Sequence, residues 1–406
     1  MRNLKDLFSP KENSPFNPGK PVPLEHFVGR EEEIARILRA AGQVVRGRQE
    51  NIFITGERGI GKSSLASYVR YAAQEEHKLA GFHVLLGGAE NVEQMAEQVI
   101  SQIIEQTHQN RTFDKVKSFL GKYVQELGLF GVKLNMKALR QDAPGVAYRF
   151  LPFLRQVYLS LKEDYKGLVL ILDDLNGITR TQKFAALLKS MVDEIAVSGN
   201  PLPLLLILIG VPERREEILE HQRSVERIFD IVEINPLKKE YVKSFFINAF
   251  KSVGMSIESD ALDRMVLFSG GLPNLMHELG DAVFWEDRDD NVDRVDAIKG
   301  TLVAADSVGR KYFSSIYKAL RSTDYHSILN KLGAVEFDLS FEKSVVEKQL
   351  TPSERNKFNN FLQRMKRLHA LNPGDIQGEW VFPNRLVRLY LLLESSRKET
   401  RGGKAR

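Results

Sequence analysis

The sequence contains no cysteine among its 406 residues, and it lacks long apolar runs. Without cysteine the chain cannot form disulfides, bind metals through thiolates or use a cysteine nucleophile. No apolar run reaches the ~18 residues that a membrane-spanning helix needs. Residues 1–23 also lack an apolar core of signal-peptide length, so we expect a cytoplasmic protein without a membrane partner.

The composition is otherwise that of an ordinary globular protein, with 43% hydrophobic and 27% charged residues. A chain of this length is expected to form about two to four domains. The net charge of +5 is mildly basic, which permits contact with nucleic acid without arguing for it.

Five short apolar runs alternate with amphipathic helical stretches in the first half of the chain. Continuous apolar runs suit strands that are buried on both faces of a parallel sheet, and alternation with helices is typical of an α/β fold. We therefore predict a five-stranded parallel sheet with strands at residues 52–55, 82–86, 168–172, 204–209 and 231–234. Residues 127–136 alternate in polarity and predict a hairpin or an additional strand.

A glycine-rich turn follows the first predicted strand. It matches the phosphate-binding pattern G-x-x-x-x-G-K-[ST] in full, with Gly56, Gly61, Lys62 and Ser63 at the fixed positions. Glycines bring backbone N–H groups close to phosphate oxygens, and the helix that follows directs its positive dipole end at the same anion. We expect the nucleotide to contact the whole turn, made of Gly56, Glu57, Arg58, Gly59, Ile60, Gly61, Lys62, Ser63 and Ser64. Lys62 would reach the β- and γ-phosphates, and the Ser63 hydroxyl would bind Mg²⁺.

The third predicted strand ends in two acids, Asp173 and Asp174. Beside a phosphate turn, the first acid would hold Mg²⁺ through its water shell, and the second would orient or deprotonate the attacking water. A strand that ends in acids usually marks only the start of a loop, but the phosphate turn favours the nucleotide site. The predicted catalytic residues are therefore Lys62, Asp173 and Asp174, and the metal ligands are Ser63 and Asp173.

The stretch FVGREEEIARIL, at residues 27–38, resembles the adenine-proximal box of the origin-recognition-like AAA+ ATPases and of related archaeal and signal-transduction (STAND) ATPases. The resemblance implies ATP rather than GTP as the ligand, and it implies a base contact for Phe27, Val28, Gly29 and Arg30. The base-reading motif N-K-x-D of GTPases does not follow the phosphate turn. A plain helix start with acids in its first turn is the alternative explanation.

The stretch SGGLPNLMHEL, at residues 269–279, resembles the second sensor region on the helical lid of these ATPases. Origin-recognition proteins usually carry an arginine near this helix start, whereas this chain has the residues Leu272, Pro273 and Asn274. The Gly-Leu-Pro form resembles the signal-transduction ATPases instead, and it implies that Pro273 packs near the nucleotide. An ordinary helix with proline in its first turn would explain the same residues.

Two arginines, Arg223 and Arg227, precede the fifth predicted strand. The AAA+ relatives place an arginine finger there, which acts on the ATP of a neighbouring subunit, and we favour Arg227 for this role. A solvated helix face is the alternative. The relatives also carry a polar first sensor at the end of the fourth strand, where residues 209–211 of this chain are Ile-Gly-Val. Either Arg214 or Arg215 substitutes for it, or this function is missing.

The C-terminal region has the pattern of a winged helix. Residues 350–371 begin with a helix signal in which Thr351 caps, Pro352 takes the first helical position and Glu354 completes a capping box. A turn and a strand follow at residues 374–384, and then an apolar helix. A winged helix is the usual C-terminal partner in the origin-recognition relatives, so the resemblance covers nearly the whole chain. It implies double-stranded DNA as a partner, while packing against the ATPase or another protein is the alternative.

We therefore predict an ATP-binding and ATP-hydrolysing AAA+-like switch that uses ATP and Mg²⁺ and controls engagement of DNA or a partner protein. The predicted fold is an α/β P-loop NTPase sheet with a helical lid and a C-terminal winged helix. The expected segments are an extended arm at 1–26, an ATPase core at 27–236, a lid at 237–300, a winged helix at 301–396 and a disordered basic tail at 397–406. Two alternatives stay open: a signalling or defence ATPase that forms homo-oligomers without binding DNA, and a regulator of transposition or DNA remodelling.

Overall fold

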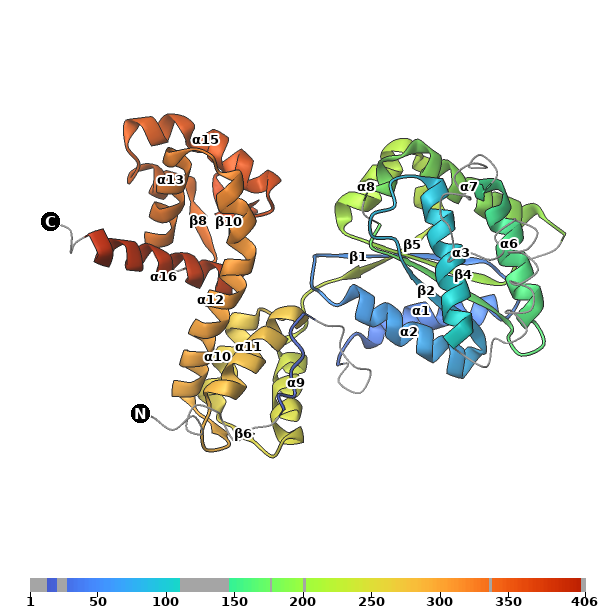
Figure 1. Cartoon of the computed structure of the whole chain (residues 1–406), viewed down its shortest axis with the longest axis horizontal. Coiled ribbons are helices and arrows are strands. Elements are labelled where there is room, and N and C mark those ends of the chain that lie inside the picture. The colour runs from blue at the N-terminus through green and yellow to red at the C-terminus, as the bar shows by residue number, and fades with distance from the viewer. Residues whose placement is uncertain are drawn as a thin grey trace, which may run out of the picture. The chain divides into compact units, whose positions relative to one another are not determined.

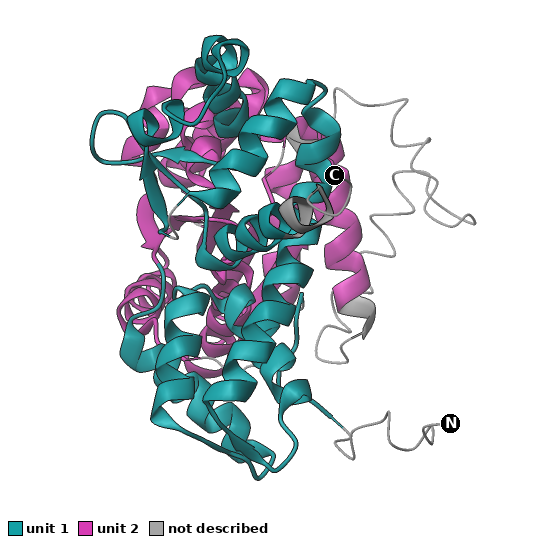
Figure 2. Cartoon of the chain, turned by 90° about the vertical axis from the view of Figure 1, so that its left-hand side faces the viewer, with its two compact units in different colours: residues 1–22, 236–406 teal, residues 23–235 magenta. Residues whose placement is uncertain are grey.

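The computed structural model describes residues 13–19, 28–109, 146–175, 177–199, 202–335 and 338–402 (Figure 1). The chain divides into two compact units (Figure 2). The sheet unit is Pro23–Asn235, and the helical unit combines Met1–Val22 with Pro236–Arg406. None of the helices in the described ranges is both long and apolar enough to span a bilayer.

The sheet unit is built on five parallel strands in the order β2-β3-β4-β1-β5. The strands are β1 (Glu50–Gly56), β2 (Leu79–Leu85), β3 (Gly167–Asp173), β4 (Leu204–Gly210) and β5 (Asp230–Ile234). β3 and β4 are buried along their whole length, as expected for apolar strands that are covered on both faces. All five predicted strands and the parallel sheet are confirmed, and their carboxyl ends meet at one edge.

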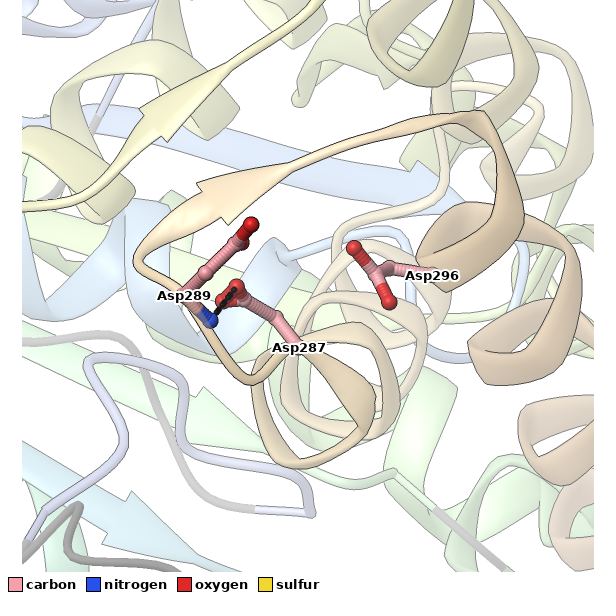
Figure 3. A group of neighbouring side chains, drawn as sticks. All are labelled: Asp287, Asp289 and Asp296. Atoms are coloured by element: carbon pink, nitrogen blue, oxygen red, sulfur yellow. Dashed lines mark hydrogen bonds between the residues drawn. The ribbon is translucent and has the colours of Figure 1, made fainter.

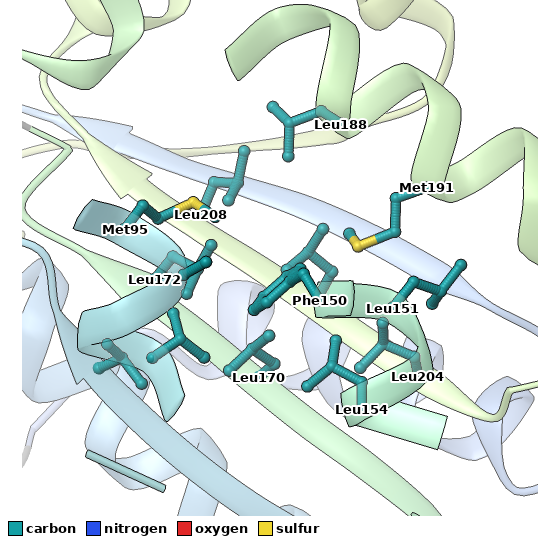
Figure 4. Packing of buried hydrophobic residues seen from close by; sticks show 14 of the residues in the cluster. Met95, Phe150, Leu151, Leu154, Leu170, Leu172, Leu188, Met191, Leu204 and Leu208 are labelled. Atoms are coloured by element: carbon teal, nitrogen blue, oxygen red, sulfur yellow. The ribbon is translucent and has the colours of Figure 1, made fainter. Parts of the chain in front are cut away.

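Helices cover both faces of this sheet (Figure 1). They are α1 (Glu31–Val44), α2 (Lys62–His77), α3 (Val92–Gln109), α6 (Val146–Leu161), α7 (Gln182–Val197) and α8 (Pro212–His221), with short 3₁₀ turns η5 (Ile178–Arg180) and η6 (Arg223–Arg227). Leucine, methionine and phenylalanine side chains from α3, α6 and α7 pack on β3 and β4 in one buried cluster (Figure 4). Each such fully buried side chain contributes about 1.5–3 kcal/mol. The hairpin predicted at 127–136 lies outside the described residues.

The helical unit begins with a group of helices that follows the sheet in sequence. It contains α9 (Lys239–Ser252), α10 (Ser259–Ser269), α11 (Pro273–Glu286) and the first half of α12 (Arg294–Ala319), with a short parallel pair of strands, β6 (Ser256–Ile257) and β7 (Asn291–Val292). The predicted boundary at residue 300 falls inside α12. Gly300 does not end the helix, because it lies where α12 packs closely against Val283 and a side chain would not fit. The lid region and the C-terminal region are therefore joined by one continuous helix.

Part of the N-terminal segment packs on these helices. Phe16 is only 3% exposed. Its ring packs against four others, those of Phe245, Phe246, Phe250 and His277. The absence of a side chain at Gly280 makes room for it, because a Cβ there would lie 2.4 Å from the Phe16 ring. Residues 13–19 of the predicted arm are therefore a packed part of the helical unit.

The turn between α11 and α12 is rich in aspartate (Figure 3). Asp287 is fully buried and accepts hydrogen bonds from the N–H groups of Asp289, at 3.4 Å, and Asp290, at 3.1 Å. Asp293 caps α12 through a reciprocal capping box with Asp296. These carboxylates satisfy the backbone donors of a tight turn and of a helix start, which explains the local concentration of acids.

The C-terminal region contains α13 (Thr323–Ala334), β8 (Ser340–Glu342), α14 (Lys343–Glu347), α15 (Pro352–Arg367), β9 (Asn372–Pro373), β10 (Glu379–Val381) and α16 (Arg385–Gly402). The three strands form an antiparallel sheet of order β8-β10-β9. The predicted capping box is present, with Thr351 N–H donating to Glu354 Oε2 over 2.7 Å. The tail predicted as disordered from residue 397 is helical as far as Gly402, because its arginine, lysine and glutamate residues favour helix and continue α16.

Candidate nucleotide-binding site

The phosphate turn connects the end of β1 to the start of α2. Gly59 and Gly61 have φ angles of 77° and 98°, in the left-handed region that glycine adopts without strain. Gly56 is required for a different reason: a Cβ there would lie 2.6 Å from the carbonyl oxygen of Ile234, which is too close. Ile60 is 1% exposed and anchors the turn in the core. The turn is thus a rigid loop at the carboxyl edge of the sheet.

Lys62 is the first residue of α2, and its half-buried side chain folds back over the turn. The ammonium Nζ donates to the carbonyl oxygen of Gly56 at 2.8 Å and to that of Glu57 at 2.7 Å. Burial lowers the pKa of Lys62 below its usual value, although the nearby carboxylate of Asp173 opposes this shift. The helix N-terminus and this ammonium concentrate positive charge at one place, which suits a phosphate ligand.

Asp173 ends β3 and is 3% exposed. Its Oδ2 lies 3.0 Å from His83 Nε2, and its Oδ1 accepts from the N–H of Asp174 at 2.8 Å. Burial by itself raises the pKa of Asp173, but hydrogen bonds from His83, Ser63 and the Asp174 amide outweigh it, so the pKa is lower than usual. An ionised carboxylate in contact with the Ser63 hydroxyl is a donor set that fits Mg²⁺, which prefers carboxylate and hydroxyl oxygens together with water.

Asp174 is exposed and has a left-handed backbone, with φ of 59°. Aspartate tolerates this conformation better than most residues, but it still carries strain, and such strain collects at functional sites. The Oδ2 atom of Asp174 lies 3.2 Å from the position that a Cβ on Gly87 would take. The second acid is therefore held at the same edge of the sheet as Asp173, close to the loop after β2.

Arg30 precedes α1 and has a left-handed backbone with φ of 74°. Its side chain is buried and donates from Nη1 to Glu33 Oε1 at 3.3 Å, while burial lowers the pKa of the guanidinium. Within the described part of the chain, Arg30 Nη2 has no hydrogen-bond partner. A buried donor without a partner is uncommon and fits a ligand that accepts a hydrogen bond. Phe27 of the predicted adenine box lies outside the described residues, and Val28 and Gly29 lead directly into Arg30.

The end of β4 carries no polar side chain, as the sequence indicates, but Arg214 lies against it. The Cβ of Arg214 is 3.0 Å from the position of a Cβ on Gly210, which pairs in register with Thr55 of β1. Arg214 Nη1 donates to both carboxylate oxygens of Glu217, at 2.7 and 2.8 Å. Arg215 instead pairs with Glu216 and Glu226. Of the two candidate substitutes, Arg214 is therefore the one at the end of β4.

The remaining predicted site residues are on other elements. Arg223 and Arg227 are exposed on η6, just before β5, and neither forms an ion pair within the ranges that the structure describes. Pro273 is the first residue of α11 and belongs to the helical unit. Sequence reasoning missed His83 as a site residue. The signal was a single polar side chain inside the otherwise apolar strand LAGFHVL.

Comparisons with known proteins agree with the fold of the sheet unit. Residues 26–207 match the family model of the AAA ATPase domain. The Walker-type ATPase of Pyrococcus abyssi is 15% identical with a TM-score of 0.56, and the alignment covers 90% of this chain and 96% of that one. The ORC2 protein of Aeropyrum pernix, solved as ADPNP-ADP complexes, is 12% identical with a TM-score of 0.57, covering 96% and 97%. A comparison with curated protein sequences gave no match.

The P-loop fold of the sheet unit, the helices that follow it and these matches all agree with the predicted resemblance. Residues 26–207 are therefore similar to the AAA ATPase domain, and the chain has a P-loop fold like that of the archaeal Walker-type ATPase and ORC2 protein.

Proposed function

We propose that the protein is a Mg²⁺-dependent ATPase that acts as a switch, in which the bound nucleotide controls engagement of DNA or of a partner protein. One observation carries this proposal: Lys62 and Ser63 of the phosphate turn lie beside the ionised carboxylate of Asp173 at the carboxyl edge of a parallel sheet. These are the groups that hold phosphate and metal in P-loop ATPases.

The binding step uses the turn and the groups around it. Backbone N–H groups of residues 56–64 would surround the phosphates, and Lys62 would exchange its two carbonyl contacts for phosphate oxygens. Ser63 and Asp173 would hold Mg²⁺, which supplies neutralisation of charge on the β- and γ-phosphates when it is bound. On the base side, the unpartnered Nη2 of Arg30 supports a contact to ATP, together with Phe27, Val28 and Gly29.

The hydrolytic step needs a group that positions water and groups that offset developing charge. Asp174 is exposed at the end of β3, and it would orient the attacking water or accept its proton. Arg214 is at the end of β4 and would respond to the γ-phosphate in place of the missing polar sensor. Arg227 is exposed and would act as a finger on the nucleotide of a neighbouring copy. This role requires a homo-oligomer.

We further propose that nucleotide state is communicated through the helical unit. Pro273 at the start of α11 would pack near the nucleotide, so that the γ-phosphate biases the position of the lid. α12 is continuous from Arg294 to Ala319, and it would transmit this change to the C-terminal region as a rigid rod.

The C-terminal region supports a winged helix with DNA as a partner. Its order of three helices, with β8 between the first two and the β9–β10 pair after the third, is that of the motif. α15 would enter the major groove, since it exposes several basic side chains, those of Arg355, Lys357, Lys366 and Arg367. Trp380 is 7% exposed and belongs to the core, so it would not serve as a platform for bases.

ATP turnover measured against protein concentration, with and without duplex DNA, tests this function. A rate per subunit that climbs with concentration supports a finger acting between copies, and stimulation by DNA supports the winged-helix role. DNA binding should weaken steeply as salt increases, because phosphate contacts release counterions. Absence of turnover under all these conditions would contradict the ATPase assignment.

A second candidate is a signalling or defence ATPase that assembles with nucleotide and does not bind DNA. The observation that favours it is a row of exposed apolar side chains on α12, formed by Val295, Ile298 and Leu302. Their spacing places them on one helix face, which suits contact with another protein. Nucleotide-dependent assembly without DNA binding at low salt would favour this candidate. Assembly that needs both ATP and DNA would instead favour a regulator of transposition or DNA remodelling.

A further inference from the structure

A histidine on β2 contacts both α2, the helix after the phosphate turn, and β3, the strand that ends in Asp173. His83 lies on β2, and its side chain is 16% exposed. Its Nε2 is 3.0 Å from Asp173 Oδ2 on β3, and its Nδ1 is 3.4 Å from the hydroxyl of Ser67. Ser67 is on α2, one helical turn after Ser63, so it shares a face with the predicted metal ligand. The imidazole therefore touches both elements that would supply Mg²⁺ ligands.

The backbone that carries His83 is fixed by a helix. β2 is at one edge of the sheet, and edge strands leave backbone groups without a strand partner. The amide side chain of Gln106 fills this role at His83, accepting from its N–H at 3.4 Å and donating to its carbonyl at 2.8 Å. Gln102 makes the same pair of bonds with Leu85, at 3.1 and 3.0 Å. Two glutamines one turn apart on α3 thus hold this part of β2 in place.

The contacts of the imidazole satisfy both of its nitrogens. Nε2–H donates to the Asp173 carboxylate, and Nδ1 shares a hydrogen bond with the Ser67 hydroxyl, which can donate or accept. The other oxygen of Asp173 is held by the Asp174 amide. With donors on both oxygens, the carboxylate cannot rotate freely.

We propose that His83 is a positioning residue for the metal site: its imidazole orients the carboxylate of Asp173 so that Mg²⁺ binds tightly together with ATP. This inference rests on the proposed function, because it assumes that Asp173 holds the metal. It goes beyond that function by assigning a residue from a strand that carries neither the phosphate turn nor the paired acids. Loss of such an outer hydrogen bond typically weakens metal binding by about 10–100-fold.

The test is the Mg²⁺ dependence of ATP binding, measured by calorimetry at a series of free Mg²⁺ concentrations and in EDTA. His83→Phe removes the donor while keeping a flat ring. We expect the Mg²⁺ concentration that gives half of the gain in ATP affinity to increase by about 10–100-fold. The ATP affinity in EDTA should stay at the wild-type value, which a general loss of structure would not allow. His83→Gln keeps a side-chain donor and should restore most of the Mg²⁺ dependence.

An unchanged Mg²⁺ dependence in folded His83→Phe overturns the inference and leaves the proposed function intact. Wild-type protein that binds no ATP, or binds it without regard to Mg²⁺, contradicts the proposed function itself. Should His83→Phe fail to fold, Ser67→Ala removes only the second contact of the imidazole. That variant should raise the required Mg²⁺ concentration by a smaller, severalfold factor, and the absence of any increase counts against the inference.

Discussion

The ammonium of Lys62 donates to the carbonyl oxygen of Gly56 over 2.8 Å, across the turn that joins β1 to α2. The two residues are the first glycine and the lysine of the phosphate-binding pattern. The backbone of the turn therefore holds the Lys62 ammonium in position. Carbonyl oxygens solvate an ammonium ion weakly compared with phosphate oxygens, which carry charge. The arrangement therefore places a preorganised cation where the account expects the triphosphate.

Asp174→Asn is expected to separate binding from hydrolysis. The amide cannot accept a proton from water, so turnover should fall by about 10²–10⁴-fold while ATP affinity stays near the wild-type value. Phosphate release and binding calorimetry measure the two quantities. Asp193→Asn on the exposed face of α7 is the matched control and should leave both unchanged. Wild-type turnover in Asp174→Asn would remove this residue from the mechanism.

Arg227→Ala is expected to lower turnover by about 10³–10⁵-fold, the range known for arginine fingers. Arg223→Ala, on the same exposed 3₁₀ turn, is the matched control and should have a small effect. Mixing Arg227→Ala with Asp174→Asn gives a sharper result. The first variant keeps an intact site and the second keeps an intact finger, so mixed assemblies should regain activity. No recovery on mixing, at any concentration, would argue against a finger that acts between copies.

Phe16→Ala is expected to destabilise the helical unit by about 3–5 kcal/mol, because it leaves a cavity among aromatic rings. Amide hydrogen exchange of α9 and α11 measures the stability of these helices directly. A local measurement is needed because a chain of two units need not unfold in one step. Leu267→Ala is the control, since Leu267 is 50% exposed and its change should stay within about 0.5 kcal/mol. Equal protection of both helices in Phe16→Ala and wild type would mean that the N-terminal segment does not support this unit.

The stability of the C-terminal region should depend on pH through the carboxylate of Glu354. Burial would raise its pKa, but hydrogen bonds from Lys331, Ser327 and Thr351 lower it from 4.5 to about 2. A lowered pKa means that the ionised form stabilises the fold above about pH 4.5, and that this contribution is lost as pH falls toward 2. Glu354→Gln should therefore cost about 1–3 kcal/mol in urea unfolding at pH 7 and much less near pH 2. Glu347→Gln is the control, because Glu347 is only partly buried and pairs with Lys343 on its own helix. A cost that does not change with pH would contradict the role of this charge.

The sequence was sufficient to predict features that depend on neighbouring residues. The phosphate turn, the acids after β3 and the capping box of Thr351 and Glu354 are each written within a few positions, so their geometry follows from local chemistry. The contact of His83 with Asp173 was not predictable, because it depends on β2 and β3 being adjacent and in register. The burial of Phe16 among helices more than two hundred residues away has the same cause.

The most direct test of the whole account is calorimetric titration of ATP with Mg²⁺ into the wild-type protein and into Lys62→Ala. We expect saturable binding with one site per chain for wild type. For the variant we expect binding weakened beyond detection, because the ammonium over the phosphate turn is lost while the fold is kept. Circular dichroism of both proteins would establish that the fold is the same. No heat with well-folded wild-type protein, or equal binding by both proteins, would contradict the central claim that this turn holds a nucleotide.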